Sequence, residues 1–354
     1  MDKTQKATLL ADMKNHPSHY DRETMYEYIV SRELTKKDLV VDENILTDKA
    51  FEHIIKYPSL SDEQRPLPLT HLYNPYSKDG NLDILLFGSP GVGKRMFLSG
   101  LLSLHGELGF CINCGHEGVE YALELQNYSR ACLIPPSCVD SFIQVIEASF
   151  RYDRGQQLPI SLIEMPGEKL IEFIRKKKPK GFADLGPGAE GILNNNNSKI
   201  VFIFIDSKEY TSYPAKNSTS YVRNCDVISE LISQFASNPS FMGKVQNIHL
   251  ILTKSDLLRD NETFDHVQDK LIEHGYGSFI HSLNQICQEY HINIDTGCRV
   301  GIYPFSVGKF MPGDMYEFDE SDSLKILQLI NRYIPFPTPK TKWTNLIREW
   351  LNSD

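Results

Sequence analysis

The chain has 354 residues, of which 41% are hydrophobic and 10% aromatic, a composition typical of a soluble globular protein with an ample core. Its formal net charge of −9 disfavours indiscriminate binding to polyanions, so we expect no nucleic-acid partner and no membrane insertion. The N-terminal residues lack an apolar run of signal-peptide length, and seven scattered cysteines favour a reducing compartment, which together predict a cytoplasmic protein.

Residues 1–66 are predicted to form a small helical module. Short helices are expected in DRETMYEYIVSREL at 21–34, after Thr35, and in TDKAFEHIIKYP at 47–58, and Thr35 and Asp38 have capping-box spacing. Two interpretations are open: the module is a cap on the main domain, or a separate adaptor for a protein partner. A proline-rich linker at 67–80 is expected to join it to a main domain at 81–335.

The run DILLFGSPGVGK at 83–94 has the pattern of a nucleotide phosphate-binding loop. A buried strand is predicted at 82–87, the glycines allow a tight turn, and RMFLSGLLSL behind them has helical apolar spacing. In such a loop, backbone N–H groups and the helix N-terminus face the phosphates, and Lys94 reaches the outer phosphates. Arg95 occupies the position where the pattern has a Ser or Thr ligand for magnesium. The predicted nucleotide-binding residues of this region are Gly88, Ser89, Pro90, Gly91, Val92, Gly93, Lys94, Arg95 and Met96.

Alternating strand and helix patterns follow the loop. Together they predict an α/β fold with a doubly wound, mainly parallel sheet of the P-loop type, which binds its ligand at the carboxyl ends of the strands. The Gly/Pro-rich run at 182–191 and the tract NNNN at 194–197 predict a flexible surface loop. Strands are expected in PISLIE (159–164), SKIVFIFID (198–206), NIHLILT (247–253) and RVGIYPF (299–305), and helices at 168–178, 225–237 and 264–274.

TKSD at 253–256 follows the strand NIHLIL, and SVG at 306–308 follows the last predicted strand. With the phosphate loop upstream, this order resembles the TRAFAC-class GTPases, and more closely their divergent bacterial members whose switch segment reads PGE. The resemblance spans about 81–334. It implies that Asp256 accepts hydrogen bonds from guanine N1–H and the 2-amino group, a pair that adenine does not offer, while the stem of Lys254 stacks along the ring. The residues implied to hold the base are Thr253, Lys254, Asp256, Ser306, Val307 and Gly308.

IEMPGE at 163–168 resembles the second switch of the same family, with Gly167 directing a backbone N–H toward the terminal phosphate. Glu164 replaces the aspartate that holds magnesium through water, so the metal, if bound, meets altered protein ligands. Arg95 either pairs with Glu164 and supplies part of the missing positive charge, or points to solvent. Glu168 either orients the attacking water or is an ordinary first-turn glutamate. Lys94, Gly167 and Glu168 are the candidate catalytic residues, and Glu164 and Ser137 the candidate metal-ligating ones, Ser137 as the hydroxyl of the first switch.

Two further patterns are each compatible with more than one role. Cys111, Cys114 and His116 have the spacing of half a zinc site, but no second CxxC pair accompanies them, which favours free thiols. A last amphipathic helix at 340–354 holds both tryptophans of the chain. It is expected either to pack on its own domain or to dock on another protein.

These patterns predict a guanine-nucleotide-binding protein with GTP or GDP as ligand and with slow or partner-stimulated GTP hydrolysis. We expect it to act as a nucleotide-dependent switch in a multi-protein system, contacting protein partners through the N-terminal helices, the switch segments at 129–140 and 164–198, or the C-terminal helix. A pseudo-GTPase scaffold is the alternative, favoured by Arg95 and Glu164. An ATP-using P-loop enzyme is the third hypothesis, and Asp256 opposes it.

Overall fold

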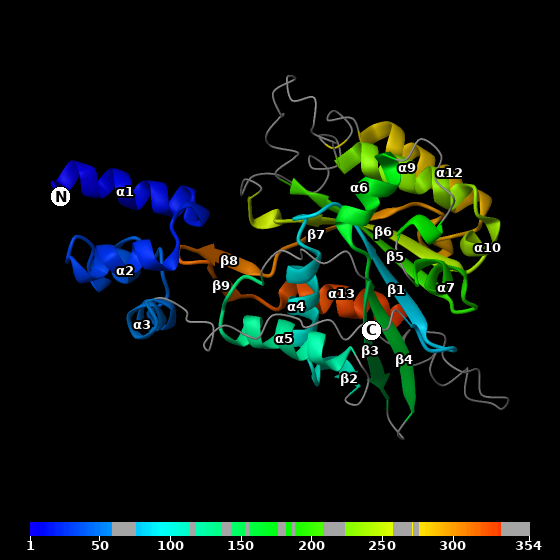
Figure 1. The fold of residues 1–354 in the computed structure, drawn as a ribbon, viewed down its shortest axis with the longest axis horizontal. Coiled ribbons are helices and arrows are strands. Elements are labelled where there is room, and N and C mark those ends of the chain that lie inside the picture. The colour runs from blue at the N-terminus through cyan, green and yellow to red at the C-terminus, as the bar shows by residue number, and fades with distance from the viewer. Residues whose placement is uncertain are drawn as a thin grey trace, which may run out of the picture.

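The structure is a computed structural model, which describes residues 1–58, 76–113, 118–135, 143–152, 156–175, 182–185, 188–207, 224–257, 271 and 276–333. A seven-stranded sheet forms its centre, with helices on both faces and a small helical module at one end (Figure 1). The strands are β1 (Leu82–Phe87), β2 (Phe110–Ile112), β3 (Gln144–Arg151), β4 (Gln157–Glu164), β5 (Lys199–Asp206), β6 (Val245–Thr253), β7 (Gly301–Phe305), β8 (Gly308–Met311) and β9 (Met315–Phe318). The α-helices are α1 (Lys3–Asn15), α2 (Arg22–Val30), α3 (Asp48–Lys56), α4 (Lys94–Ser103), α5 (Val119–Arg130), α6 (Gly167–Arg175), α7 (Ala189–Asn194), α9 (Asn224–Ala236), α10 (Pro239–Met242), α12 (Gly277–Glu289) and α13 (Ser321–Arg332).

The strand order is β2-β3-β4-β1-β5-β6-β7. Strand β1 pairs in parallel with β4 and β5, and β6 pairs in parallel with β5 and β7, which confirms the predicted doubly wound, mainly parallel sheet. The edge strand β2 and its neighbour β3, which are joined to the sheet by antiparallel pairing, were not predicted. Strand β2 is short, and β3 interrupts its apolar residues with Glu147 and Ser149, so neither has the continuous apolar run of a buried parallel strand.

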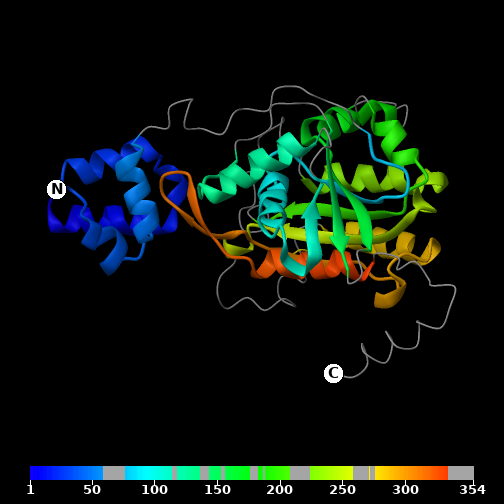
Figure 2. The ribbon, with the colours of Figure 1, turned by 90° about the horizontal axis from the view of Figure 1, so that it is seen from below.

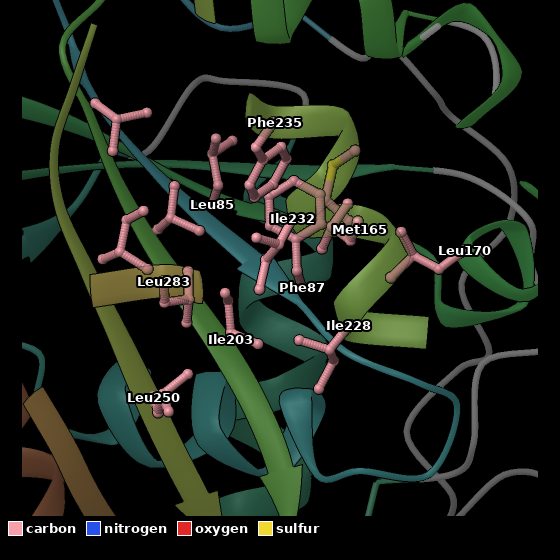
Figure 3. Packing of buried hydrophobic residues seen from close by; sticks show 14 of the residues in the cluster. Leu85, Phe87, Met165, Leu170, Ile203, Ile228, Ile232, Phe235, Leu250 and Leu283 are labelled. Carbon is pink, nitrogen blue, oxygen red and sulfur yellow. The ribbon is translucent and has the colours of Figure 1, made fainter. Parts of the chain in front are cut away.

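Side chains alternate between the two faces of the sheet and build two cores. Leu85 and Phe87 of β1 enter the core beneath α6, α9 and α12, whereas Ile84 and Leu86 enter the core beneath α4 and α13. Figure 3 shows the first of these cores, where Phe87 meets Phe235 of α9 with ring centroids 5.2 Å apart. This two-layer covering holds the carboxyl end of β1, where the phosphate loop begins, in a rigid setting.

Within the segment at 182–197, the described residues 182–185 and 188–197 do not form the flexible surface loop that their composition predicts. The described part forms a turn of 3₁₀-helix at Phe182–Leu185 and helix α7, which buries Ile192 and Leu193. Asn195 then donates to Asp83 over 3.0 Å, and Asn197 donates to the same carboxylate. Lys199 Nζ lies 3.1 Å from Asp83 Oδ2 with both side chains fully buried. The asparagines are therefore the hydrogen-bond partners that a buried ion pair needs, which local composition does not reveal.

Residues 1–58 form the N-terminal helical module, built from α1, α2, α3 and a turn of π-helix at Lys37–Asp42. Thr35 N donates to Asp38 Oδ2 over 2.7 Å and Asp38 N donates to Thr35 Oγ1 over 3.3 Å, which confirms the predicted capping box. Helix α1 lies within the predicted module, but no helix was predicted before residue 21. The core of the module includes Met25 and Ile54 together with Met311 and Met315 of the hairpin β8–β9, so the module packs on that hairpin (Figures 1 and 2).

Several predictions fall outside the described residues: most of the linker at 67–80, all but Leu271 of the helix at 264–274, and the helix at 340–354. The domain boundaries accordingly stay predictions. Across the helices that the structure does describe, none combines the length and the apolar composition needed to cross a bilayer.

Candidate functional site

The loop between β1 and α4 has the backbone of a phosphate-binding loop. Gly91 and Gly93 adopt φ values of +72° and +99°, a region that favours glycine. A Cβ at Gly88 would lie 2.8 Å from Val92 Cγ1, so this position has no room for a side chain. Lys94 begins α4, is 6% exposed, and donates from Nζ to the carbonyl oxygens of Gly88 over 2.8 Å and Ser89 over 3.2 Å. Its ammonium group thus lies across the mouth of the loop, where a phosphate ligand would meet it.

A cavity of about 220 Å³ opens in front of this loop. One end is formed by the phosphate loop and Gly167, and the other by Lys254, Asp256 and Ser306, so the structure brings the predicted motifs of the phosphate and base regions together in one space. The lining residues are Pro90 to Met96, Ile134, Pro135, Gln144, Glu164, Pro166 to Glu168, Thr253, Lys254, Asp256, Phe305 to Val307 and Phe310.

Arg95 points into the site and pairs with Glu164. Its Nε lies 4.0 Å from Glu164 Oε2, and the two side chains are 13% and 9% exposed. The hydroxyl of Tyr121 donates to the same carboxylate, and the Arg95 guanidinium lies 5.6 Å from the centre of the Tyr121 ring. Of the two interpretations given above, the structure supports the salt bridge and excludes a solvent-directed Arg95. Tyr121 was missed because it lies in α5, in a stretch that carries no motif.

This cluster does not fit a protein-held magnesium ion of the predicted kind. A guanidinium occupies the position of the expected hydroxyl ligand, and Oε2 of Glu164 already accepts from Tyr121. Magnesium prefers several oxygen ligands in a nearly octahedral shell, and a guanidinium offers none. The predicted ligand Ser137 lies outside the described residues.

Gly167 lies directly against the phosphate loop. A Cβ built on it would be 2.4 Å from Pro90 N and 2.6 Å from the carbonyl carbon of Ser89, so only glycine fits here. The peptide N–H of Met165 donates to Leu86 O over 3.1 Å, and this hydrogen bond holds the chain that leads to Gly167 against the end of β1. Glu168 follows in the first turn of α6 and lines the same cavity. The structure therefore places Gly167 against the loop between β1 and α4, and Gly167 and Glu168 both line the cavity, while their predicted roles toward a phosphate stay predictions.

The opposite end contains the residues predicted to hold the base. Ser306 Oγ lies 3.0 Å from Asp256 Oδ1, so the two motifs TKSD and SVG meet. Lys254 has a φ of +56° and its Nζ lies 2.5 Å from Asp206 Oδ2 at the end of β5. This lysine–aspartate pair was not predicted, although Asp206 ends a strand whose apolar run was recognised. Thr253, which precedes Lys254 in the chain, has its Oγ1 2.5 Å from Val92 O and 3.1 Å from Ile205 O.

The turn at 306–308 is fixed by its own hydrogen bonds. Ser306 N donates to Asp322 Oδ2 over 3.0 Å, and Gly308 N donates to Ser306 Oγ over 3.2 Å. Gly308 has a φ of +132°, and a Cβ there would lie 1.8 Å from Glu317 O. A side chain at this position would separate the strands of the hairpin that follows, which explains the glycine in SVG.

Metal-binding chemistry elsewhere is limited in the described residues. Cys111 is half-buried with a free thiol, and Cys114 and His116 lie outside the described part, so the zinc hypothesis stays a prediction. Asp12, His16 and His19 of the helical module place potential ligand atoms within 4.8 Å of one another. Both Asp12 oxygens are already bonded, Oδ1 to His16 over 2.9 Å and Oδ2 to Tyr20 over 2.5 Å, and both histidines are exposed. This cluster belongs to the helical module, and none of its residues lines the cavity.

No protein-family model matches the chain, and no curated protein matches it in sequence. Among solved structures, it is similar to the GTPase-like domain of Ski7 from S. cerevisiae, bound to GDP and inorganic phosphate, with 17% identity and a TM-score of 0.38. The GTP-bound structure of the same domain gives 16% identity and a TM-score of 0.37. Each match covers 73% of this chain and 51% of the other, so the chain spans about half the length of those structures. At this level of similarity, the assignment of the site rests on the chain's own residues.

Proposed function

We propose that this chain binds a guanine nucleotide, GTP or GDP, in the cavity between the phosphate loop and the TKSD and SVG motifs. The observation that carries the proposal is that Lys94 and Gly167 line one end of the cavity while Lys254 and Asp256 line the other. A ligand that fills this space meets phosphate-binding N–H groups and an ammonium at one end, and a carboxylate suited to the two donors of guanine at the other.

The buried cluster of Arg95, Tyr121 and Glu164 supports a specific electrostatic role for Arg95. Glu164 and Tyr121 hold the guanidinium beside the first turn of α4, where the outer phosphates would lie. A fixed cation there stabilises phosphate charge without the reorganisation that a mobile side chain requires. We therefore propose that nucleotide binding is largely independent of magnesium.

Hydrolysis of GTP, if it occurs, is the attack of water on the γ-phosphate to give GDP and phosphate. Lys94 and the backbone N–H groups of the loop and Gly167 stabilise the developing charge, and Glu168 is the candidate for positioning the water. Turnover is proposed to be slow or stimulated by a protein partner, because Arg95 stands in place of the hydroxyl that would bind magnesium directly, and this reaction depends on the charge stabilisation that such a metal supplies.

Calorimetric titration of the nucleotide-stripped full chain tests the binding proposal. GTP, GDP and ATP are each titrated in magnesium and again in EDTA, against the wild type, D256A and the control D48A, whose aspartate is exposed on α3. We expect GTP and GDP to bind at least 100-fold more tightly than ATP, D256A to lose that preference, and D48A to keep it. A preference for ATP would support the P-loop enzyme instead, and no binding of any nucleotide would overturn the proposal.

A pseudo-GTPase scaffold is the second candidate, and the Arg95–Glu164 pair favours it because the pair takes the place of the usual metal ligands. In that case nucleotide has a structural role, and the helical module and the switch segments recruit protein partners in a multi-protein system. Single-turnover hydrolysis of bound GTP separates the two candidates. Release of phosphate that is lost in E168Q supports the GTPase, and bound GTP that persists unchanged supports the scaffold.

A further inference from the structure

The hairpin β8–β9, residues 308–318, extends from the main domain to the N-terminal helical module (Figure 2). It begins at Gly308, two residues after Ser306, whose hydroxyl donates to Asp256. Because adjacent residues of a strand point to opposite faces, Phe310 lines the cavity while its neighbour Met311 enters the core of the module. Met315, which pairs with Met311 across the hairpin, enters the same core.

Polar contacts also join the hairpin to the module. Gly313 N, at the tip of the hairpin, donates to Tyr20 O over 2.6 Å, and Lys309 Nζ donates to Asn44 O over 2.7 Å. Met311 and Met315 are 3% and 1% exposed, so the apolar contact excludes water. A shift of the hairpin away from the module would therefore break these hydrogen bonds and expose the side chains of Met311 and Met315 to water.

A third segment is bonded to the same hairpin. Tyr316 N donates to Cys132 O over 3.0 Å, and Ile134 N donates to Asp314 O over 3.1 Å. Ile134 also lines the cavity. The hairpin is thus the common support of the base end of the cavity, of the chain that follows α5, and of the helical module.

We propose that Phe310 stacks on the base of the bound nucleotide and that the hairpin β8–β9 couples occupancy of the cavity to the stability of the helical module. The inference rests on the proposed nucleotide binding and adds a residue and a linkage to it. Phe310 lines the same cavity as Lys254 and Asp256, and its aromatic ring has the flat apolar surface on which a base stacks. A ligand that orders the hairpin also stabilises what packs on its other face, and the effect is reciprocal.

Hydrogen exchange on the full chain tests the linkage, with GDP, with inorganic pyrophosphate, and with neither. Pyrophosphate fills a phosphate loop but has no base. We expect GDP, and not pyrophosphate, to slow amide exchange at 308–318 and in the module at 20–56. F310A is expected to weaken GDP affinity about tenfold and to abolish the effect on the module at saturating GDP. F318A, which removes an aromatic ring from the same hairpin at a position that does not line the cavity, is expected to retain both.

Each outcome bears on one claim. Absence of GDP binding to the wild type overturns the proposed function itself. Binding of GDP without slower exchange in the module overturns the linkage and leaves the function intact. Retention of the module effect in F310A shows that Phe310 does not transmit it. If F310A fails to fold, the reciprocal variant I54A, which creates a cavity in the module core away from the nucleotide, decides: the linkage requires it to weaken GDP affinity by about threefold or more, and unchanged affinity excludes it.

Discussion

Thr253 Oγ1 lies 2.5 Å from the backbone oxygen of Val92, which joins the start of the TKSD motif to the phosphate loop. The hydroxyl has one proton, and the shorter of its two contacts identifies Val92 as the acceptor. Thr253 is 2% exposed, so this bond is made in a dry environment where neither group has access to water. The contact fixes the distance between the two ends of the cavity. Thr253 therefore positions both the phosphate loop and the TKSD motif.

Replacing Thr253 with valine tests this role. T253V keeps the shape of the side chain but leaves the carbonyl of Val92 without its donor, which costs about 1 to 3 kcal/mol in the free energy of unfolding. Nucleotide affinity is expected to fall as well, because the loop is no longer held at its middle. Chemical denaturation and calorimetric titration measure the two effects, with the exposed hydroxyl variant S282A as control. A T253V variant with wild-type stability and affinity would contradict the assignment.

Gly167 gives a prediction with a matched control in the same chain. In G167A, the added Cβ lies 2.4 Å from Pro90 N and 2.6 Å from the carbonyl carbon of Ser89. Both atoms belong to the backbone and cannot rotate aside, so the segment that contains residue 167 must move away from the phosphate loop. Phosphate affinity is expected to fall at least tenfold, with a loss of stability of about 1 to 3 kcal/mol. In G191A the Cβ meets nothing within 4 Å and the residue is in α7, so helix propensity raises stability by up to about 1 kcal/mol. Thermal unfolding and titration of both variants measure the contrast.

The sequence was sufficient to predict the parallel strands and the order of motifs around the cavity. Strands β1, β4, β5, β6 and β7 are predominantly apolar, and each motif follows the end of one of them, which places the motifs at one edge of the sheet. Contacts made by isolated residues were not predictable. Tyr121 and Asp206 meet Glu164 and Lys254 only because the chain folds, and no local pattern distinguishes them from other residues of their type. The packing of the module on the hairpin β8–β9 is likewise a tertiary contact between segments far apart in the chain.

Arg95 gives a prediction about metal dependence. If its guanidinium supplies charge that magnesium usually supplies, wild-type affinity for GDP is nearly the same in magnesium and in EDTA. R95S removes that charge and restores a hydroxyl ligand, so we expect binding about tenfold or more weaker in EDTA than in magnesium. R130S, which alters an exposed arginine at the end of α5, is the control. Equal loss of affinity in both buffers for R95S would show a structural role for Arg95 and no relation to the metal.

We expect His249 to make the stability of the fold depend on pH. It lies fully buried on β6 among the rings of Phe202, Tyr303 and Tyr333, and neither ring nitrogen has a hydrogen-bond partner in the described structure. Burial lowers the pKa of His249 from 6.5 to about 4, an effect that the nearby Asp295 carboxylate only partly opposes.

The direction of the effect follows from which state binds the proton. Between pH 6.5 and pH 4 the unfolded chain protonates this histidine and the folded chain does not, so the free energy of unfolding falls as the pH falls through that window. The loss approaches about 3 kcal/mol near pH 4, and the contribution is fully present above pH 6.5. H249L removes the titrating group and its unsatisfied nitrogens, so its stability at neutral pH is expected to equal or exceed that of the wild type. Denaturant unfolding of both proteins from pH 4 to pH 7 gives the difference in slope, and H281Q, at an exposed position on α12, is expected to retain the wild-type slope. Parallel curves for H249L and the wild type would show that the pKa of His249 is the same in the folded and the unfolded chain, which would contradict this prediction.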